Sequence, residues 1–529
     1  MLTRVAHHGG ELLAQAVQRL YRTGQTDYSL DPLVRVDANG RPVGRIGAGD
    51  AVIFCCRRGE REVELTEAFT ERDFPHFSRP ELPNLDFVIL TLYHEKFKDL
   101  PVAFAPVNIP DTLGEVVSRA GLSQMRCAES EKYVHVTFFL NGGNSQPFAG
   151  EVDVRVPSPT GIPFDQIPEL SLPEVTEKVI AGINAKTDLI VVNFANGDVI
   201  GHIANHQAKI RCAEVVDQYL GSMISQAVDA GYVIAVTADH GNLEVLLTED
   251  GSPHVSHTSN PVPFLLIDPA AKQRLKLKPG RLADIAPTVL EILGLQPADL
   301  MTGESLIKGH VWGKDRRVLL VILDGWGLGR TDDSNPIYLA HTPIWDRLNE
   351  QYPPVKLQAA GEAVGLKAGK TGNSEAGHMN IGAGRVVLQD DVRLDQSMAD
   401  GTFFSNEVLI SAMEGVKQRN TSLHLIGLLT EKSSHGSIDY PLALLKMARE
   451  RGMQDVYLHI IFDGRSTAPG SAPLLLTRLE KCMSEIGLGQ IVTGIGRGIA
   501  LDRDLNYGKI KRAYDALVLG TGTAYPAWD

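Results

Sequence analysis

The sequence has no hydrophobic segment of the length that spans a membrane. A spanning helix needs roughly 18 or more consecutive apolar residues, and no run in the 529 residues approaches that length. The start of the chain, Met1 to Leu20, predicts an amphipathic helix with His7, His8 and Glu11 and lacks the apolar centre of a signal peptide. We therefore expect a protein without a membrane partner.

Cysteine is scarce, and basic residues are outnumbered by acidic ones. The five cysteines, of which Cys55 and Cys56 are adjacent, fit neither a disulfide framework nor paired zinc knuckles, so a reducing cytoplasm is the expected compartment. The formal net charge of -13 argues against nucleic acid and anionic membranes as partners. A local basic pocket for a small anion is compatible with this charge. We expect a cytoplasmic monomer that binds a small molecule.

The apolar pattern predicts an α/β protein with more than one domain, because a chain of this length exceeds one hydrophobic core. A helix is expected at 11–22, and an apolar strand is expected after Lys132. Further strands are expected at 34–36, 43–46, 51–54, 189–192, 232–236, 264–267, 318–323, 423–429 and 456–462. Strands that alternate with helices favour a doubly wound sheet, in which ligands gather beyond the carboxyl ends of the strands.

Acidic and imidazole side chains follow three of these strands. Asp198, Asp239 and Asp324 each come shortly after a strand, with His202 close to Asp198 and His240 next to Asp239. His257 lies in a separate segment, just before the strand expected at 264–267. Asp198 and His202 would share one face if their segment is helical. Carboxylate and imidazole ligands suit Mn²⁺ or Zn²⁺ better than Ca²⁺. One such pair is most often structural, but three strand ends together indicate a two-metal site.

A glycine-rich stretch from Lys370 to Arg385 carries one serine, Ser374. Glycines allow a tight turn and a close approach of the backbone to a ligand, and a serine that opens a helix lies where free N–H groups attract phosphate. A hydroxyl is a weak nucleophile unless a base or a metal activates it. The stretch by itself equally fits a turn with a helix-capping serine.

Basic residues also follow several strands, and each has two interpretations. The segment from Arg57 to Arg61 is either a solvated loop or an arginine clamp for phosphate or carboxylate. Lys132 is either a surface charge or a cation that steadies a phosphate. His435, Arg465 and Arg497 follow strands as well, and such residues are singly more often surface groups.

Five motifs together resemble the family of cofactor-independent phosphoglycerate mutases, within the alkaline phosphatase superfamily. They are Asp324-Gly325-Trp326-Gly327, Gly372 to His378, Ala128 to Tyr133, Asn196 to His202, and Ala238 to Asn242. The resemblance covers nearly the whole chain. In the family, the strand that ends in Asp-Gly-Trp-Gly begins the protein, whereas here it begins at residue 318. The chain therefore resembles a circular permutant in which Gly309 to Arg317 joins the family's ordinary ends.

The resemblance implies two α/β domains and a set of site residues. Residues 107–388 would form an alkaline-phosphatase-like, metal-binding domain, and residues 1–106 with 389–529 would form a smaller transferase domain. One Mn²⁺ would be held by Asp198, His202 and His257, and a second by Asp324, Ser374, Asp239 and His240, with Mg²⁺, Zn²⁺ or Co²⁺ as alternatives. The implied substrate-binding residues are Arg58, Arg61, Arg465, Arg497, Arg503, Lys132 and His435. Ser374, His435 and Lys132 would be catalytic.

The implied reaction is the interconversion of 3-phosphoglycerate and 2-phosphoglycerate, as in glycolysis, through a phosphoserine on Ser374. The departures from the family lie on the transferase side, where Ser466 replaces an aspartate of the motif Asp-Gly-Arg-Asp-Thr. A serine cannot act as a carboxylate base. Two alternatives follow, a metal-dependent phosphatase or phosphomutase that acts on another small phosphorylated acid, and a non-catalytic paralogue.

Overall fold

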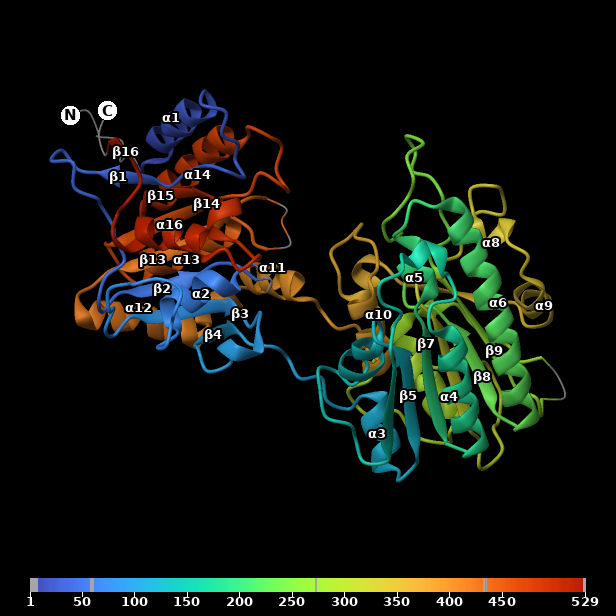
Figure 1. Ribbon diagram of the computed structural model, residues 1–529. Helices are drawn as coiled ribbons and strands as arrows, with labels where there is room; N and C mark the ends of the chain where they lie inside the picture. The colour runs from blue at the N-terminus through green and yellow to red at the C-terminus, as the bar shows by residue number, and fades with distance from the viewer. Residues whose placement is uncertain (1–7, 58–60, 272–273, 432, 434, 527–529) are drawn as a thin grey trace. The chain divides into compact units, whose positions relative to one another are not determined.

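The computed structural model describes residues 8–57, 61–271, 274–431, 433 and 435–526. The chain forms two compact units, each with its own sheet (Figure 1). Unit 1 comprises residues 1–106 and 393–529, and unit 2 comprises residues 107–392. Unit 1 is therefore built from both ends of the sequence, whereas unit 2 is one continuous segment. Among the described residues, the structure contains no helix with the length and apolar character required to cross a bilayer.

Unit 2 contains an eight-stranded sheet in the order β10-β12-β9-β8-β11-β7-β5-β6. The strands are β5 (Gln124–Glu129), β6 (Glu151–Val156), β7 (Leu189–Phe194), β8 (Val233–Thr237), β9 (Val262–Ile267), β10 (Gly280–Arg281), β11 (Val318–Leu323) and β12 (Val355–Gln358). β11, β7 and β8 are buried at every position, as expected for parallel strands covered on both faces. The helices are α3 (Leu113–Arg119), α4 (Leu172–Asn184), α5 (Asn196–Gly201), α6 (His206–Asp229), α7 (Ile285–Ile292), α8 (Pro336–Leu339), α9 (Pro343–Gln351) and α10 (Ser374–Ala383).

The register of the three central strands of unit 2 places their carboxyl ends side by side. β11 lies between β7 and β8 and runs parallel to both, so that Leu323 pairs with Phe194 and Ile322 pairs with Thr237. Groups that follow these three strands consequently meet at one edge of the sheet. β11 comes after β7 and β8 in the sequence but separates them in the sheet.

Two predictions of strands were wrong, because the segment after Lys132 and the segment 43–46 do not form strands. The segment after Lys132 forms a short π-helical turn, His135–Phe139, and the strand precedes it as β5. In this turn Val136 is buried while Phe138 is exposed, so the apolar run packs one side only. The segment 43–46 forms a turn in which Gly44 has a φ of 64°, a conformation that favours glycine and interrupts a strand.

Unit 1 contains a second eight-stranded sheet, in the order β16-β1-β15-β14-β13-β2-β3-β4. The strands are β1 (Leu33–Val36), β2 (Ala51–Phe54), β3 (Asp86–Thr91), β4 (Val102–Phe104), β13 (Leu423–Leu429), β14 (Val456–Phe462), β15 (Gln490–Gly496) and β16 (Thr523–Pro526). The helices are α1 (Gly10–Tyr21), α2 (Val63–Thr70), α12 (Glu407–Arg419), α13 (Asp439–Glu450), α14 (Ala472–Ile486), α15 (Arg497–Ala500) and α16 (Tyr507–Val518), with α11 (Asp390–Asp400) at the boundary of the units.

Helices cover both faces of the unit 1 sheet, which makes it doubly wound like the sheet of unit 2. Residues of α1, α12, α13 and α14 pack with Ile53 and Leu458 in one core. Residues of α2, α15 and α16 pack with Phe54 and Ile461 in the other. β15, β14, β13 and β2 are parallel neighbours. Their carboxyl ends therefore form a second edge at which polar side chains can gather.

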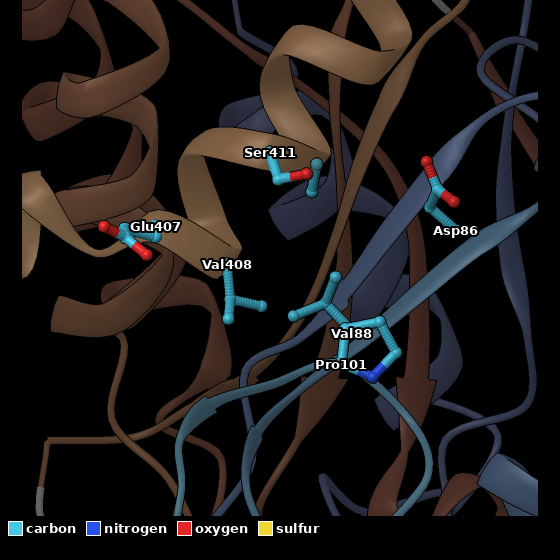
Figure 2. A pocket seen from close by; sticks show the side chains of 7 residues that line it. Asp86, Val88, Pro101, Glu407, Val408 and Ser411 are labelled. Atoms are coloured by element: carbon cyan, nitrogen blue, oxygen red, sulfur yellow. The ribbon is translucent and has the colours of Figure 1, made fainter.

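A cavity of about 280 Å³ lies between α12 and the strands β3 and β4 of unit 1. Figure 2 shows Asp86 and Val88 on one side of it and Glu407, Val408 and Ser411 on the other. Asp86 is the first residue of β3, so the cavity is at the amino end of that strand. The Asp86 carboxylate already accepts a hydrogen bond of 2.6 Å from Arg419. Within unit 1, this cavity is thus at the opposite end of β3 from its carboxyl end.

Candidate active site

The three predicted strand-end aspartates converge in unit 2. Asp324 directly follows β11, Asp239 follows β8, and Asp198 lies in α5, which begins just after β7. The backbones here approach so closely that a side chain would not fit, because a Cβ atom on Gly197 would lie 2.5 Å from the carbonyl oxygen of Asp324. The parallel strands and this glycine together bring the carboxylates to one place.

Asp198, His202 and His257 form one group of potential metal ligands. Oδ1 of Asp198 lies 3.2 Å from Nε2 of His202 and 3.0 Å from Nε2 of His257. The two Nε2 atoms are 3.1 Å apart. Each imidazole is anchored through its other nitrogen, since Nδ1 of His202 lies 2.9 Å from the carbonyl oxygen of Val255, and Nδ1 of His257 lies 2.8 Å from that of Gly372. Such anchoring directs Nε2 toward a metal.

Asp239, His240, Asp324 and Ser374 form the second group. Nε2 of His240 lies 2.9 Å from Oγ of Ser374, 3.4 Å from Asp324 and 3.5 Å from Asp239. The Ser374 hydroxyl lies 3.2 Å from Oδ1 of Asp324, to which it can donate. All four residues are buried. His240 also lies near Asp198, at 3.8 Å, and could therefore serve either group.

Ser374 is the first residue of α10, and it does not cap that helix. The cap is Asn373, whose side chain accepts a hydrogen bond of 2.8 Å from the backbone N–H of Ala376. The interpretation of Ser374 as a helix-capping serine is therefore wrong. Its hydroxyl instead points to His240 and Asp324, at the end of a helix where backbone N–H groups favour an anion.

Lys132 is a buried member of this site, not a surface charge. Its Nζ atom lies 2.6 Å from Oγ of Ser374, 2.7 Å from Asp198 and 2.8 Å from Asp324. The side chain is 6% exposed. Although burial lowers the pKa of Lys132, the surrounding aspartates outweigh that effect and raise its pKa above the ordinary value. The ammonium thus stays charged and connects the serine to two carboxylates.

Three further residues hold the site in place and were missed from the sequence. The Asn193 amide donates to Oδ2 of Asp324 at 2.7 Å, and the Asn242 amide donates to Oδ1 of Asp198 at 2.9 Å. His378 lies one helical turn after Ser374, and its Nδ1 is 2.9 Å from the Ser374 carbonyl oxygen and 3.3 Å from Asp239. Asn242 and His378 lie inside the motifs Ala238 to Asn242 and Gly372 to His378. Only the fold shows which atoms these two residues contact.

The electrostatics of the site keep its carboxylates ionised. Burial raises the pKa of Asp324, but the ammonium of Lys132 and the imidazole of His240 outweigh it and hold the pKa well below its ordinary value. The same balance lowers the pKa of Asp198. For His240, burial lowers the pKa, whereas Asp239 and the other carboxylates raise it to about 9. The site therefore concentrates negative charge, as a cation site requires.

The donor set fits divalent metal ions. Two groups offer ligand atoms within 4.8 Å of one another: Asp198, His240 and His257, and Asp239, His240 and Asp324. Oδ2 of Asp239 is buried, and its polar neighbours among the described residues are Nδ1 of His378 at 3.3 Å and Nε2 of His240 at 3.5 Å. Carboxylate oxygens and neutral imidazole nitrogens are ligands of Mn²⁺, Zn²⁺ and similar ions. The predicted ligands are thus close enough together to bind metal.

The remaining predicted residues lie in unit 1, near the carboxyl ends of β2, β13, β14 and β15. Arg61 and Arg497 are buried, Arg61 donating to the Leu501 carbonyl oxygen at 3.0 Å and Arg497 pairing with Asp463. Arg465 and Arg503 are exposed. His435 is largely buried, with Nδ1 at 3.0 Å from Glu62. Arg58 lies outside the described residues.

The fold and this site define a metalloenzyme of the alkaline phosphatase type. Residues 35–297 match the Metalloenzyme superfamily, and residues 394–527 match the BPG-independent PGAM N-terminus. A 2,3-bisphosphoglycerate-independent phosphoglycerate mutase of Syntrophotalea carbinolica is 44% identical over 301 residues, or 56% of this chain and 58% of that protein. The mutase of the same name from Synechococcus sp. is 44% identical over 309 residues, or 56% and 57%.

In both of these parts the chain is similar to cofactor-independent phosphoglycerate mutases. It spans somewhat more than half the length of the curated relatives that it matches. A crystal structure of Leishmania mexicana phosphoglycerate mutase at low cobalt concentration aligns with a TM-score of 0.40 and 28% identity, over 52% of this chain and 53% of that one.

Proposed function

We propose that the protein interconverts 3-phosphoglycerate and 2-phosphoglycerate through a phosphoserine on Ser374. The observation that carries the proposal is the environment of the Ser374 hydroxyl, which lies 2.6 Å from Nζ of Lys132 and 2.9 Å from Nε2 of His240. A serine among cationic and metal-binding groups at a helix N-terminus is suited to accept a phosphoryl group. The named relatives are mutases of this type.

In the first half of the reaction, Oγ of Ser374, held as the alkoxide after its proton has passed to solvent, attacks the phosphorus of 3-phosphoglycerate. The bond between phosphorus and the C3 oxygen breaks, and that oxygen takes up a proton. Lys132 contacts the nucleophile directly and neutralises charge that develops on the phosphoryl group. Two divalent ions, for which Mn²⁺ is our first choice, would lower the pKa of the serine hydroxyl and stabilise the transferred phosphoryl group.

In the second half, the C2 hydroxyl of the retained glycerate attacks the phosphoserine, which regenerates Ser374 and yields 2-phosphoglycerate. We assign the recognition of the glycerate to cationic residues of unit 1, namely Arg58, Arg61, Arg465, Arg497 and Arg503. Bidentate guanidinium groups suit a carboxylate and its neighbouring hydroxyls. His435 would handle the proton that leaves one oxygen and joins the other.

A metal-dependent phosphatase or a phosphomutase for another small acid is the second candidate. It is favoured by Ser466, which is exposed and whose hydroxyl lies 3.5 Å from that of Ser433. A hydroxyl at this position cannot take the proton that a carboxylate would take. If the glycerate hydroxyl is not activated, water would hydrolyse the phosphoserine instead.

A single assay separates these functions. The purified chain is incubated with Mn²⁺ and 3-phosphoglycerate, and 2-phosphoglycerate and free phosphate are measured together. The proposed function requires 2-phosphoglycerate with little free phosphate. Dominant release of phosphate would favour the phosphatase, and a lack of product from any phosphoester would favour a non-catalytic paralogue.

We also infer that the family's order of segments is circularly permuted here. The match to the family's N-terminal segment lies at residues 394–527, behind the match at residues 35–297. The mutase of Syntrophotalea carbinolica has about the same length as this chain, because the 301 aligned residues make up 56% of this chain and 58% of that protein. The alignment nevertheless covers little more than half of either sequence. Within the proposed joint Gly309 to Arg317, Val311 is 92% exposed, as is usual for a connector.

The permutation can be tested by restoring the family's order. A variant that joins the present ends by a short flexible linker and opens the chain within Gly309 to Arg317 should fold, bind metal and show the same reaction. Loss of folding in this variant would contradict the proposed order.

We place the protein in the cytoplasm, in keeping with five free cysteines among the described residues.

A further inference from the structure

Glu62 is a fully buried carboxylate in unit 1 to which no role has been assigned. It immediately precedes α2, and its side chain does not cap that helix. Oε1 lies 3.0 Å from Nδ1 of His435, and Oε2 accepts a hydrogen bond of 3.2 Å from the backbone N–H of Arg61. Glu62 and His435 are separated by 373 positions in the sequence. Only the fold therefore brings this carboxylate to the histidine.

The orientation of His435 is fixed from several sides. Its backbone N–H donates to the Ser433 hydroxyl at 3.2 Å, and its carbonyl oxygen accepts from the backbone N–H of Arg57 at 2.9 Å. Glu62 then holds the ring itself. The His435 side chain is 14% exposed, whereas that of Glu62 is 0% exposed. A ligand can consequently reach the imidazole but not the carboxylate behind it.

The carboxylate determines which ring nitrogen of His435 carries the proton. When Glu62 is ionised its carboxylate only accepts hydrogen bonds, and Nδ1 of His435 is then the donor. Nε2 makes no hydrogen bond with any of the residues that the structure describes, and it is left with a free lone pair when the ring is neutral. Burial raises the pKa of Glu62, and the hydrogen bond with His435 opposes that rise.

We propose that Glu62 is the positioning residue that prepares His435 for proton transfer to and from the glycerate oxygens, an inference that rests on the proposed function. The imidazolium donates its Nε2 proton to the C3 oxygen as the bond from that oxygen to phosphorus breaks. Nε2 then takes the proton of the C2 hydroxyl as this oxygen bonds to phosphorus and the Ser374 ester breaks. The cycle thus returns the proton to Nε2, and Glu62 stabilises the imidazolium at both ends of the cycle.

The tautomer of His435 can be measured without any activity. Full-length protein labelled with ¹⁵N in the histidine rings is studied by NMR at alkaline pH, and the His435 signals are assigned by their loss in His435→Gln. We expect the neutral ring to carry its proton on Nδ1 in the wild type and to lose this single tautomer in Glu62→Gln. A wild-type ring protonated on Nε2 would overturn the proposal.

Kinetics distinguish positioning from a structural role. General acid–base groups contribute roughly 10²- to 10⁴-fold, so Glu62→Gln should lower kcat by at least about ten-fold with little change in KM. Glu62→Asp should retain part of the activity. The same Glu62→Gln change in a His435→Gln background should cost nothing further, because both residues act as one unit. An equal loss in both backgrounds would overturn the proposal.

Glu64→Gln provides the matched control. Glu64 is also a buried carboxylate of the α2 region, where it accepts a hydrogen bond of 3.0 Å from the backbone N–H of Leu505. Its replacement should leave kcat and the His435 tautomer unchanged, and a comparable loss would show that the Glu62 effect is merely structural. If the wild type only releases phosphate, the proposed mutase function fails, whereas the tautomer measurement still decides the role of Glu62.

Discussion

Nζ of Lys132 lies 2.6 Å from Oγ of Ser374. The same ammonium lies within 2.8 Å of carboxylate oxygens of Asp198 and Asp324. One buried cation therefore connects the proposed nucleophile to one residue from each group of potential metal ligands. The serine, the lysine and the potential metal ligands form one continuous polar cluster. Replacing any member should therefore alter the charge and the contacts of the others.

Lys132→Met should strongly destabilise unit 2 when metal is removed. The change leaves two buried carboxylates without their cation, a loss of about 3–5 kcal/mol for a broken buried ion pair. Bound metal should reduce this loss, because it supplies positive charge to the same carboxylates. Unfolding in chelator and in Mn²⁺ measures both effects. Lys278→Met, which breaks the exposed pair with Glu304, should cost no more than about 1 kcal/mol, and an equal cost for both variants would contradict the prediction.

His257→Ala should weaken metal binding without unfolding the chain. A ligand that binds only the folded state stabilises it, so Mn²⁺ should raise the melting temperature of the wild type and raise it less in the variant. His257 lies 3.0 Å from Asp198 and is anchored on the Gly372 carbonyl oxygen. His341→Ala removes an exposed imidazole of the same unit and should behave as the wild type. Identical metal shifts in all three proteins would refute the assignment.

Glu129 should make the stability of unit 2 depend on pH. Burial is the main cause that raises the pKa of Glu129 from 4.5 to about 7. A raised pKa means that the folded state favours the protonated carboxyl, so this stabilisation is present below the unfolded pKa and is lost as the pH rises through the folded pKa. The free energy of unfolding of the wild type, relative to Glu129→Gln, should therefore fall between about pH 4.5 and about pH 7.

Denaturant titrations across that pH range measure the effect of Glu129. The matched control is Glu131→Gln, which removes the charge of an exposed carboxylate two residues away. The relative stability of the wild type should show a larger pH dependence against Glu129→Gln than against Glu131→Gln. Equal trends for the two variants would mean that burial of Glu129 is not the cause.

Ser466→Asp should raise the rate of 2-phosphoglycerate formation relative to phosphate release. It returns a carboxylate to a position where this chain has a hydroxyl, and general-base catalysis contributes roughly 10²- to 10⁴-fold, so a gain of about ten-fold or more is expected. Ser466→Asn has the same shape without the charge and should give no gain. Equal rates for the wild type and the aspartate variant would show that position 466 does not limit the reaction.

The part of the site that follows strand ends could be predicted from the sequence. Asp198, Asp239 and Asp324 follow uninterrupted apolar runs, and parallel strands end at a common edge. The sequence does not contain the order of the strands, in which β11 separates β7 from β8. It also does not contain contacts between remote segments, such as that of Asn193 with Asp324.

Local context overrode the sequence pattern where the predictions failed. The apolar residues after Lys132 suggested a strand, but the helical turn His135–Phe139 buries one side of them while Phe138 stays exposed. Asn373 and Ser374 are both suitable helix caps by type, and the backbone geometry selects Asn373. Glu62 gave no signal at all, because its meaning depends on His435, a residue brought close only by the sheet.

The fate of a single phosphate tests the proposed route most directly. The full-length protein with Mn²⁺ is mixed with 3-phosphoglycerate that carries radioactive phosphorus, and the reaction is stopped with acid at increasing times. We expect the label to appear first on the peptide that contains Ser374 and then in 2-phosphoglycerate, with little free phosphate, and we expect Ser374→Ala to remain unlabelled and inactive. Label that reaches 2-phosphoglycerate without passing through Ser374, or that leaves the enzyme as free phosphate, would contradict the proposed function.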